Sequence, residues 1–202
     1  KNIFKNFCNE SKIIIIKNGI DLNELYSSNT NFIQKYSIEK KFILFLGRFH
    51  QVKGIDTLLE SIKQIKNNPL VNEIIFVIMG VDFGYQKVIK KTIKDYDLSE
   101  RICLIEKPPR SDVISAYSQC EFLVLPSKWE LSPLTPLEGF AFKKTLVSTT
   151  AHGIPFTIKH NENCILIEPE NYAQLSTAIL DLLQNEEKCK KLGKSGYDLV
   201  HS

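Results

Sequence analysis

The sequence has no long apolar segment. None of its apolar runs approaches the ~20 residues that a transmembrane helix needs, and the isoleucine tetrad 13–16 is short enough to suit a buried strand. The chain starts with Lys1 rather than methionine, and no signal peptide stands at its start. We therefore expect a fragment or the ordered part of a longer chain.

Cysteine pairs with metal-binding spacing are also absent. The cysteines are odd in number, no two are spaced C-x-x-C, and the histidines form no ligand spacing. Three cysteines lie in apolar, strand-like surroundings, where a free thiol behaves as a small hydrophobe. This pattern predicts reduced structural thiols in a cytoplasmic protein, without a metal site or disulfides. The cysteines are Cys8, Cys103, Cys120, Cys164 and Cys189, and the histidines are His50, His152, His160 and His201.

Strong charge of one sign is a third absence. The net charge is only +3, and the lysines are interleaved with glutamates and aspartates. Charge alone therefore favours neither nucleic acid nor a membrane as a partner. The 202 residues, 43% of them hydrophobic and 24% charged, fit one large globular domain with a sizeable core.

Apolar runs alternate with helical patterns through the rest of the chain. Phe42–Leu46 is a continuous apolar run, which suits a strand covered on both faces. Residues 55–65 repeat isoleucine and leucine at helical spacing. Further strands are expected at 74–79, 102–105, 122–125, 146–148 and 164–167, and further helices at about 85–96, 111–119, 136–142, 171–184 and 186–200.

These repeated β-α units predict an α/β fold. The expected architecture is a Rossmann-like, doubly wound, mostly parallel sheet of about six strands with helices on both faces. Such sheets bind ligands at the carboxyl ends of their strands. Residues 1–40 differ, because they contain the turn signal Asn18–Asp21 and a polar stretch from 27. We interpret 1–40 as an interdomain linker remnant with a lead-in strand, and 41–202 as the ligand-binding domain.

Charged residues follow two of the expected strands. Arg48 and Lys53 stand in the loop after the first strand, before a helix that begins near Gly54. A helix N-terminus favours an anion, and two cations strengthen that preference. Glu130 follows the fourth strand and Glu138 opens the next helix. Carboxylates accept well from sugar hydroxyls, although solvated cations and a helix-capping carboxylate would also explain these residues.

Together these stretches resemble the C-terminal domain of the retaining glycosyltransferases with the GT-B fold, known as the glycosyl transferases group 1 family. The similar stretches are Lys17–Asp21, Ile43–Arg48 with Lys53-Gly54, Pro126-Ser127 with Glu130, and Leu137-Glu138. The resemblance implies that Arg48 and Lys53 hold the donor diphosphate and stabilise the leaving group. It implies that Glu130 faces the donor sugar and that Glu138 accepts ribose hydroxyls.

The expected catalytic residues are thus Glu130, Arg48 and Lys53, and Gly47 and Leu134 join the donor-binding set. The resemblance implies hexosyl transfer, with retention, from a nucleotide diphosphate sugar. No cofactor or metal is expected, because two side chains neutralise the leaving diphosphate. The acceptor (a glycan, a lipid or a small molecule) would bind through an N-terminal domain absent here, so we expect this chain alone to be inactive. A peripheral membrane contact is expected only of the full-length protein.

The sequence departs from the family in two loops. After the first glutamate the family commonly has Gly-Phe-Gly, whereas this chain has Leu131–Pro133 and then Pro136, which removes N–H donors. The family's G-G-x-P-E loop reads His152–Phe156, with phenylalanine in place of the acidic residue. Lys143 stands where glycine is frequent, and a left-handed helix cap there would strain it.

These departures keep two alternatives open. One is a non-catalytic module that binds sugar nucleotides, and the other is an epimerase or phosphorylase relative with the GT-B fold. Lys107 and Arg110 lie near the end of the third strand, where the family binds the base, but they identify no particular base. We expect a packing role for Trp129, and a structural or solvent-exposed role for His152.

Overall fold

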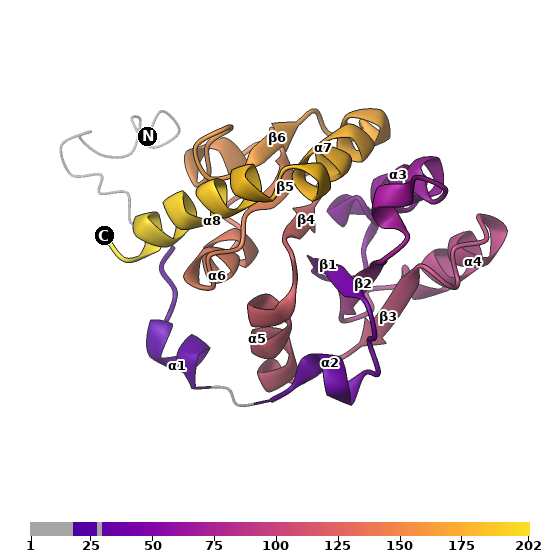
Figure 1. Ribbon diagram of the computed structural model, residues 1–202, viewed down its shortest axis with the longest axis horizontal. Helices are drawn as coiled ribbons and strands as arrows, with labels where there is room; N and C mark the ends of the chain where they lie inside the picture. Colours follow the sequence, from indigo (N-terminus) through magenta and orange to yellow (C-terminus); the bar gives the residue numbers. More distant parts are fainter. Residues whose placement is uncertain (1–17, 28–29) are drawn as a thin grey trace, which may run out of the picture.

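The computed structural model describes residues 18–27 and 30–202. In this part of the chain six parallel strands form one sheet in the order β3-β2-β1-β4-β5-β6 (Figure 1). The chain builds the sheet outward from β1 in one direction up to β3 and then in the other direction from β4, so the strand order reverses between β1 and β4. This confirms the Rossmann-like, doubly wound fold. The strand expected at 13–16, Lys17 and Cys8 lie outside the described residues. The strands are β1 (Lys41–Leu46), β2 (Ile74–Gly80), β3 (Ile102–Glu106), β4 (Leu123–Leu125), β5 (Leu146–Thr149) and β6 (Ile165–Ile167).

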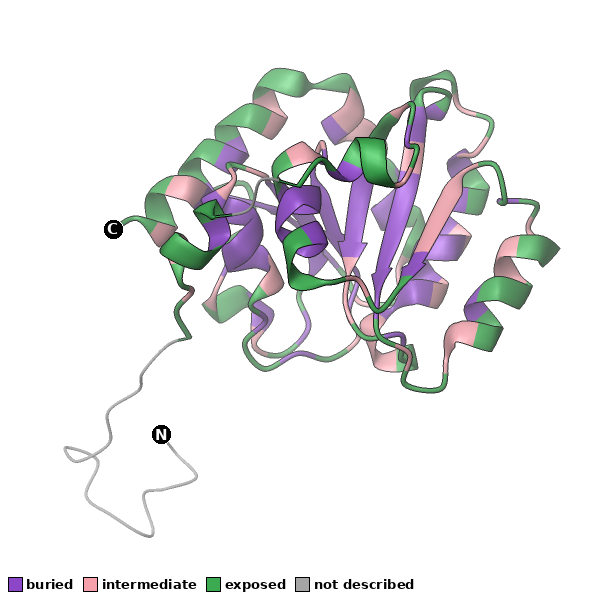
Figure 2. Ribbon diagram, turned by 90° about the horizontal axis from the view of Figure 1, so that it is seen from below, coloured by how far each residue is buried: buried purple, intermediate pink, exposed green. Residues whose placement is uncertain are grey.

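The central strand β1 is buried on both faces. Ile43 and Phe45 pack in one apolar cluster, while Phe42 and Leu44 pack in another. Successive side chains of a strand point to opposite faces, so the two clusters form two cores separated by the sheet. Figure 2 shows the buried strands between helices whose outer surfaces are exposed. Burial on both faces explains why β1 is a continuous apolar run rather than an alternating one.

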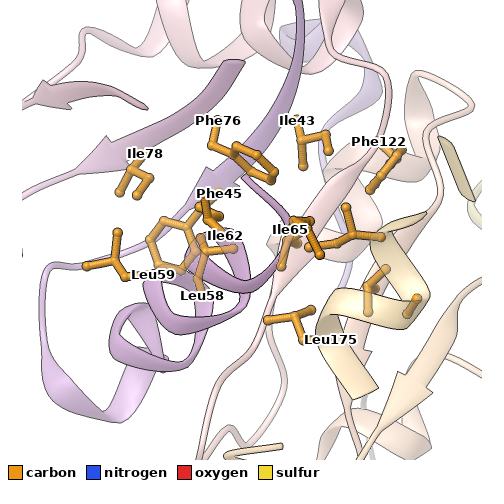
Figure 3. Packing of buried hydrophobic residues seen from close by; sticks show 14 of the residues in the cluster. Ile43, Phe45, Leu58, Leu59, Ile62, Ile65, Phe76, Ile78, Phe122 and Leu175 are labelled. Carbon is orange, nitrogen blue, oxygen red and sulfur yellow. The ribbon is translucent and has the colours of Figure 1, made fainter. Parts of the chain in front are cut away.

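Helices cover both faces and are packed by apolar side chains. Leu58, Leu59 and Ile62 of α3 meet Phe45 in the first cluster (Figure 3), which α4 and α7 complete, while α5 and α6 contribute to the second. The predicted strand and helix ends differ from the observed ones by about one residue. The helices are α3 (Ile55–Ile65), α4 (Gln86–Asp95), α5 (Arg110–Gln119), α6 (Thr135–Ala141), α7 (Tyr172–Gln184) and α8 (Glu186–Val200), with 3-10 turns at Gln51–Lys53, Pro69–Val71 and Ile154–Phe156.

Residues 18–27 and 30–40 contain two short helices that were not predicted from the sequence. They are α1 (Leu22–Tyr26) and α2 (Phe32–Lys35). Asp21 caps α1 by accepting hydrogen bonds from two backbone N–H groups. Leu25 packs against α5 and α6, and Phe32 enters the second core cluster. The segment is therefore attached to the domain, and its interpretation as an interdomain linker stays a prediction.

Two glycines of α8 allow it to approach α6 closely. A Cβ on Gly193 would lie 2.0 Å from the carbonyl oxygen of Lys143, and one on Gly196 would lie 2.2 Å from the ring of Phe140. Lys143 follows α6 with φ of 57°, so the left-handed cap that glycine favours is kept by a lysine. Its Nζ lies 4.8 Å from the ring centroid of Tyr197 on α8.

We expect Gly193→Ala to destabilise the fold. Alanine favours a helix over glycine by about 1 kcal/mol, but the methyl group would meet a backbone carbonyl, and overpacking costs about 1–3 kcal/mol or more. The free energy of unfolding, measured by urea denaturation, should therefore fall. Gly19→Ala is the control, because no atom lies within 4 Å of a Cβ there. A stabilised Gly193→Ala variant would mean that α8 is free to move away from α6.

Candidate functional site

The loops after β1 and β4 touch where the strand order reverses. Gly54 has φ of 69°, and a Cβ there would lie 1.9 Å from the carbonyl oxygen of Pro126. The N–H of Lys128 donates a hydrogen bond of 2.8 Å to the carbonyl oxygen of Val52. The crevice at such a reversal is the usual ligand site of doubly wound sheets. The close approach at Gly54 therefore brings the two charged loops together at that position.

Lys53 and Glu130 form an ion pair between these loops. The ammonium of Lys53 donates to Oε1 of Glu130, and the hydroxyl of Ser127 donates to the same oxygen at 3.0 Å. Their side chains are only 13% and 11% exposed, so water screens the pair weakly and each charge depends on its partner. The structure thus joins two of the three predicted catalytic residues.

Arg48 lies apart from this ion pair and is exposed. Its guanidinium carbon lies 5.1 Å from the ring centroid of Phe83, in the loop after β2, a cation–π contact. The N–H of Gly47 donates to the carbonyl oxygen of Met79 at 3.1 Å. A Cβ on Gly80 would lie 1.8 Å from the carbonyl oxygen of Gly47. The predicted donor residue Gly47 is therefore fixed against β2 through its backbone.

The N-terminus of α3 follows Lys53 directly. Gly54 caps it without a side-chain hydrogen bond, which leaves N–H groups for an anion. Asp56 in the first turn is itself an anion, but the ammonium of Lys128 lies 2.7 Å from its carboxylate and 2.7 Å from that of Glu170. The charge of Lys128 is thus shared by these two carboxylates.

Glu138 lies buried in the first turn of α6. Its Oε1 accepts a hydrogen bond of 2.6 Å from Nη2 of Arg110, and its Oε2 accepts one of 2.7 Å from the hydroxyl of Tyr117. Arg110 also donates to both carboxylate oxygens of Glu24 on α1, at 3.1 and 3.2 Å. The predicted ribose acceptor is therefore held by two donors of α5.

Exposed apolar side chains separate Glu130 from α6. Leu131 is 69% exposed and Leu134 is 44% exposed. Leu134 is the N-cap of α6, and its carbonyl oxygen accepts from the N–H of Glu138 at 2.9 Å. Pro136 in the first turn supplies no N–H. The predicted donor residue Leu134 thus lies on the helix that carries Glu138.

The loop after β5 packs on this apolar segment. The N–H of Gly153 donates to the carbonyl oxygen of Glu130 at 2.9 Å, and a Cβ on Gly153 would lie 1.6 Å from the carbonyl oxygen of Leu131. Phe156 is 82% exposed. With residues 18–20 and the end of α8, these loops line a groove of about 730 Å³. His152 is exposed, and its ring lies 5.7 Å from that of Trp129.

The four described cysteines (Cys103, Cys120, Cys164 and Cys189) are free thiols. Burial raises the pKa of Cys120 and of Cys164 to about 12, so both stay protonated and act as small apolar groups. Within 18–27 and 30–202, no three His, Cys, Asp or Glu side chains gather as metal ligands. No helix in this part of the chain is long and apolar enough to cross a membrane.

Comparison with known proteins shows the family of the chain. Residues 28–199 match the family described as glycosyl transferases group 1. The chain belongs to that family. It is 31% identical over 187 residues to an uncharacterised glycosyltransferase of Methanocaldococcus jannaschii, covering 93% of this chain and 48% of that protein. It spans about half the length of the curated relatives it matches.

Solved structures share the fold at low identity. HepE of Anabaena, in complex with UDP-glucose, superposes with a TM-score of 0.82 at 18% identity, over 98% of this chain and 55% of that one. The C-terminal domain of a glycosyl transferase group 1 family protein of Francisella tularensis, LpcC, gives a TM-score of 0.76 at 23% identity. That match covers 91% of this chain and 97% of the Francisella domain, so the likeness spans that whole domain.

The partners of Glu138 and Arg48 were not predicted from the sequence. Arg110 was expected only as a cation near the base, and neither Tyr117 nor Phe83 was singled out. Tyr117 follows Arg110 by seven positions on a helix, which puts both on nearly one face. That spacing was the available signal, but the sequence did not indicate which carboxylate the face would meet.

We expect Lys53 and Glu130 to be energetically coupled in the folded protein. A double-mutant cycle with Lys53→Met and Glu130→Gln should give a coupling of about 1–3 kcal/mol in urea unfolding, because the pair is nearly buried. The matched control is the exposed pair Lys91–Asp95, 2.5 Å apart on α4, where we expect a coupling of about 0.5 kcal/mol or less. Equal coupling energies in the two cycles would contradict the shielding of the Lys53–Glu130 pair from water.

Proposed function

We propose that this chain is the donor-binding half of a glycosyltransferase that uses a nucleotide diphosphate sugar. The observation that carries the proposal is the Lys53–Glu130 pair between the β1 and β4 loops, with Glu138 buried on the adjoining helix. This set offers a cation for phosphate and two carboxylates for hydroxyls at one sheet edge. The UDP-glucose complex of Anabaena HepE, which shares the fold, supports such a donor.

Arg48 and Lys53 would act on the diphosphate. As the glycosidic bond breaks, the leaving nucleoside diphosphate gains negative charge, and cations already in position stabilise it. Arg48 is exposed and can fork onto phosphate oxygens. Lys53 would exchange part of its contact with Glu130 for the phosphate. No metal or cofactor is needed for this step in the proposed scheme.

Glu138 and Glu130 would act on the two sugars of the donor. Glu138 would accept hydrogen bonds from the ribose hydroxyls. Glu130 would face the transferred sugar, a hexose in our proposal, and stabilise the positive charge that develops on its ring. Gly47 and Leu134 would line the donor through their backbones. We propose retention at the anomeric carbon, as the family resemblance implies.

The remaining half of the enzyme would supply the acceptor site. The acceptor, a glycan, a lipid or a small molecule, would bind through an N-terminal domain, and the full-length protein would work in the cytoplasm with a peripheral membrane contact. Alone, this chain would bind the donor weakly without transfer, because a site open on one side stays wet and its electrostatic interactions are screened.

A second candidate is a module that binds sugar nucleotides without transfer. The feature that favours it is the segment between Glu130 and α6, where Pro133 is buried and Pro136 lies in the first turn. Neither residue offers an N–H to a ligand. Transfer by the protein with both halves would decide against this alternative.

Donor binding by this chain is the first test. By calorimetry with UDP, GDP and ADP, Arg48→Ala and Lys53→Ala should each weaken diphosphate binding about tenfold or more, since a charged hydrogen bond contributes about 1.5–3 kcal/mol. They should change nucleoside binding little. Lys90→Ala on the exposed side of α4 is the charge control. Unchanged diphosphate affinity in Arg48→Ala at low salt would remove that residue from the site.

The role of Glu130 is tested by steady-state kinetics of the protein with both halves. Glu130→Gln keeps the shape but removes the charge, so kcat should fall roughly ten- to a thousandfold with little change in donor KM. Thermal unfolding should accompany the assay, because the variant also breaks the pair with Lys53. A raised KM with normal kcat would instead assign Glu130 to ground-state binding.

A further inference from the structure

Arg110 joins two carboxylates from distant parts of the chain. It opens α5, and its guanidinium lies between Glu24 of α1 and Glu138 of α6. The side chain of Glu138 is only 12% exposed, whereas those of Glu24 and Arg110 are 49% and 42% exposed. The hydrogen bonds and charges of the two glutamates raise the pKa of Arg110. The guanidinium is therefore a permanent cation shared by the two glutamates.

Tyr117 fixes the second oxygen of Glu138. It is fully buried, and burial together with the neighbouring Glu138 raises the pKa of Tyr117 well above its usual value. The hydroxyl therefore stays protonated and donates to Oε2. With Arg110 on Oε1 and Tyr117 on Oε2, the plane of the Glu138 carboxylate is set from two sides.

This arrangement leaves free acceptor capacity on both oxygens. An ionised carboxylate has about four lone-pair positions, and the two hydrogen bonds occupy one on each oxygen. Within residues 18–27 and 30–202 no further hydrogen bond takes the second position on either oxygen. Two neighbouring hydroxyl groups of one ligand suit such a pair, because each can donate to its own oxygen. The geometry is that of a receptor for a vicinal diol, and ribose carries one.

We propose that Arg110 is the positioning residue for ribose recognition. Its hydrogen bond to Oε1 of Glu138 orients the carboxylate so that the free acceptor positions face both ribose hydroxyls. The contacts of Arg110 with Glu24 of α1 fix the guanidinium in turn. This inference rests on the proposed function, because it needs a nucleotide in the crevice. It adds that discrimination between ribose and deoxyribose depends on a residue that touches neither sugar.

A purely structural role for Arg110 makes a different prediction. If Arg110 only compensates a buried charge, its loss would lower stability and weaken every ligand alike. A positioning role changes the ratio of affinities between a ribonucleotide and its 2′-deoxy counterpart. That ratio is the readout that a structural role would not move.

The experiment measures this ratio by calorimetry on the 202-residue chain. The probes are UDP and 2′-deoxy-UDP, or the GDP or ADP pair if that diphosphate binds more tightly. We expect the wild-type chain to prefer the ribonucleotide by roughly tenfold or more, the effect of one charge-assisted hydrogen bond. Glu138→Gln should reduce the preference to about twofold. Arg110→Ala should reduce it to about threefold or less, while affinity for the deoxynucleotide changes by about threefold at most.

Further variants distinguish the positioning role of Arg110 from the effect of its charge and from a loss of folding. Arg110→Lys keeps the cation but lacks the planar guanidinium, whose Nε and Nη2 donate to both oxygens of Glu24, so it should lose most of the preference even if Arg110→Ala does not fold. Glu24→Gln should lose part of it. Lys90→Ala, one positive charge removed from α4, should keep the wild-type ratio.

Three outcomes would overturn the proposal. If Glu138→Gln abolishes the preference but both Arg110 variants keep it, Arg110 does not position Glu138, and the proposed function stands. If the wild-type chain binds diphosphates without preferring ribose, Glu138 is no diol receptor, and the phosphate assignment stands. If no nucleoside diphosphate binds, both this inference and the proposed function fail.

Discussion

The close approach of the β1 and β4 loops is the constraint on which the site depends. Gly54 lies against the carbonyl of Pro126 with a left-handed backbone and no room for a Cβ, so only glycine fits there without moving a strand end. That contact brings Lys53 within reach of Glu130. Because both side chains are nearly buried, each charge would be costly without the other. A backbone contact thus sets the electrostatics of the crevice.

The second carboxylate depends on helix packing. Glu138 is carried by α6. Helix α8 packs closely on α6 because Gly193 and Gly196 leave room for the carbonyl of Lys143 and the ring of Phe140. The charge of Glu138 is compensated from α5, by Arg110 and Tyr117. A buried carboxylate without such donors would have lost its hydrogen bonds to water without replacement, which is costly. The packing of three helices is therefore what lets a charged acceptor stand beside the crevice.

The two loops that depart from the family lie side by side. Gly153 bonds to the backbone of Glu130 and packs on Leu131, so a change in one loop bears on the other. Both expose apolar side chains, Leu131 and Phe156, beside a groove of about 730 Å³. The departures therefore form one altered surface next to the crevice rather than two separate substitutions.

Much of the fold was predictable from local patterns. β1 is a continuous apolar run because both its faces are covered, and α3 repeats apolar residues because one side faces the sheet. Such periodicities depend on residues close in sequence, so they can be recognised without the tertiary structure. α1 and α2 escaped prediction because each is only four or five residues long and is stabilised by Leu25 and Phe32 packing on distant elements.

The candidate site divides in the same way. The sequence by itself determined which strand ends carry Arg48, Lys53, Glu130 and Glu138, because charged residues after apolar runs are visible in the order of the chain. Only the tertiary structure decided that Lys53 meets Glu130, 77 positions away, and that Arg110 joins Glu138 to Glu24, 28 and 86 positions away. The physical reason is that an ion pair depends on distance in space, which the crossovers of the sheet set and which separation along the chain does not encode.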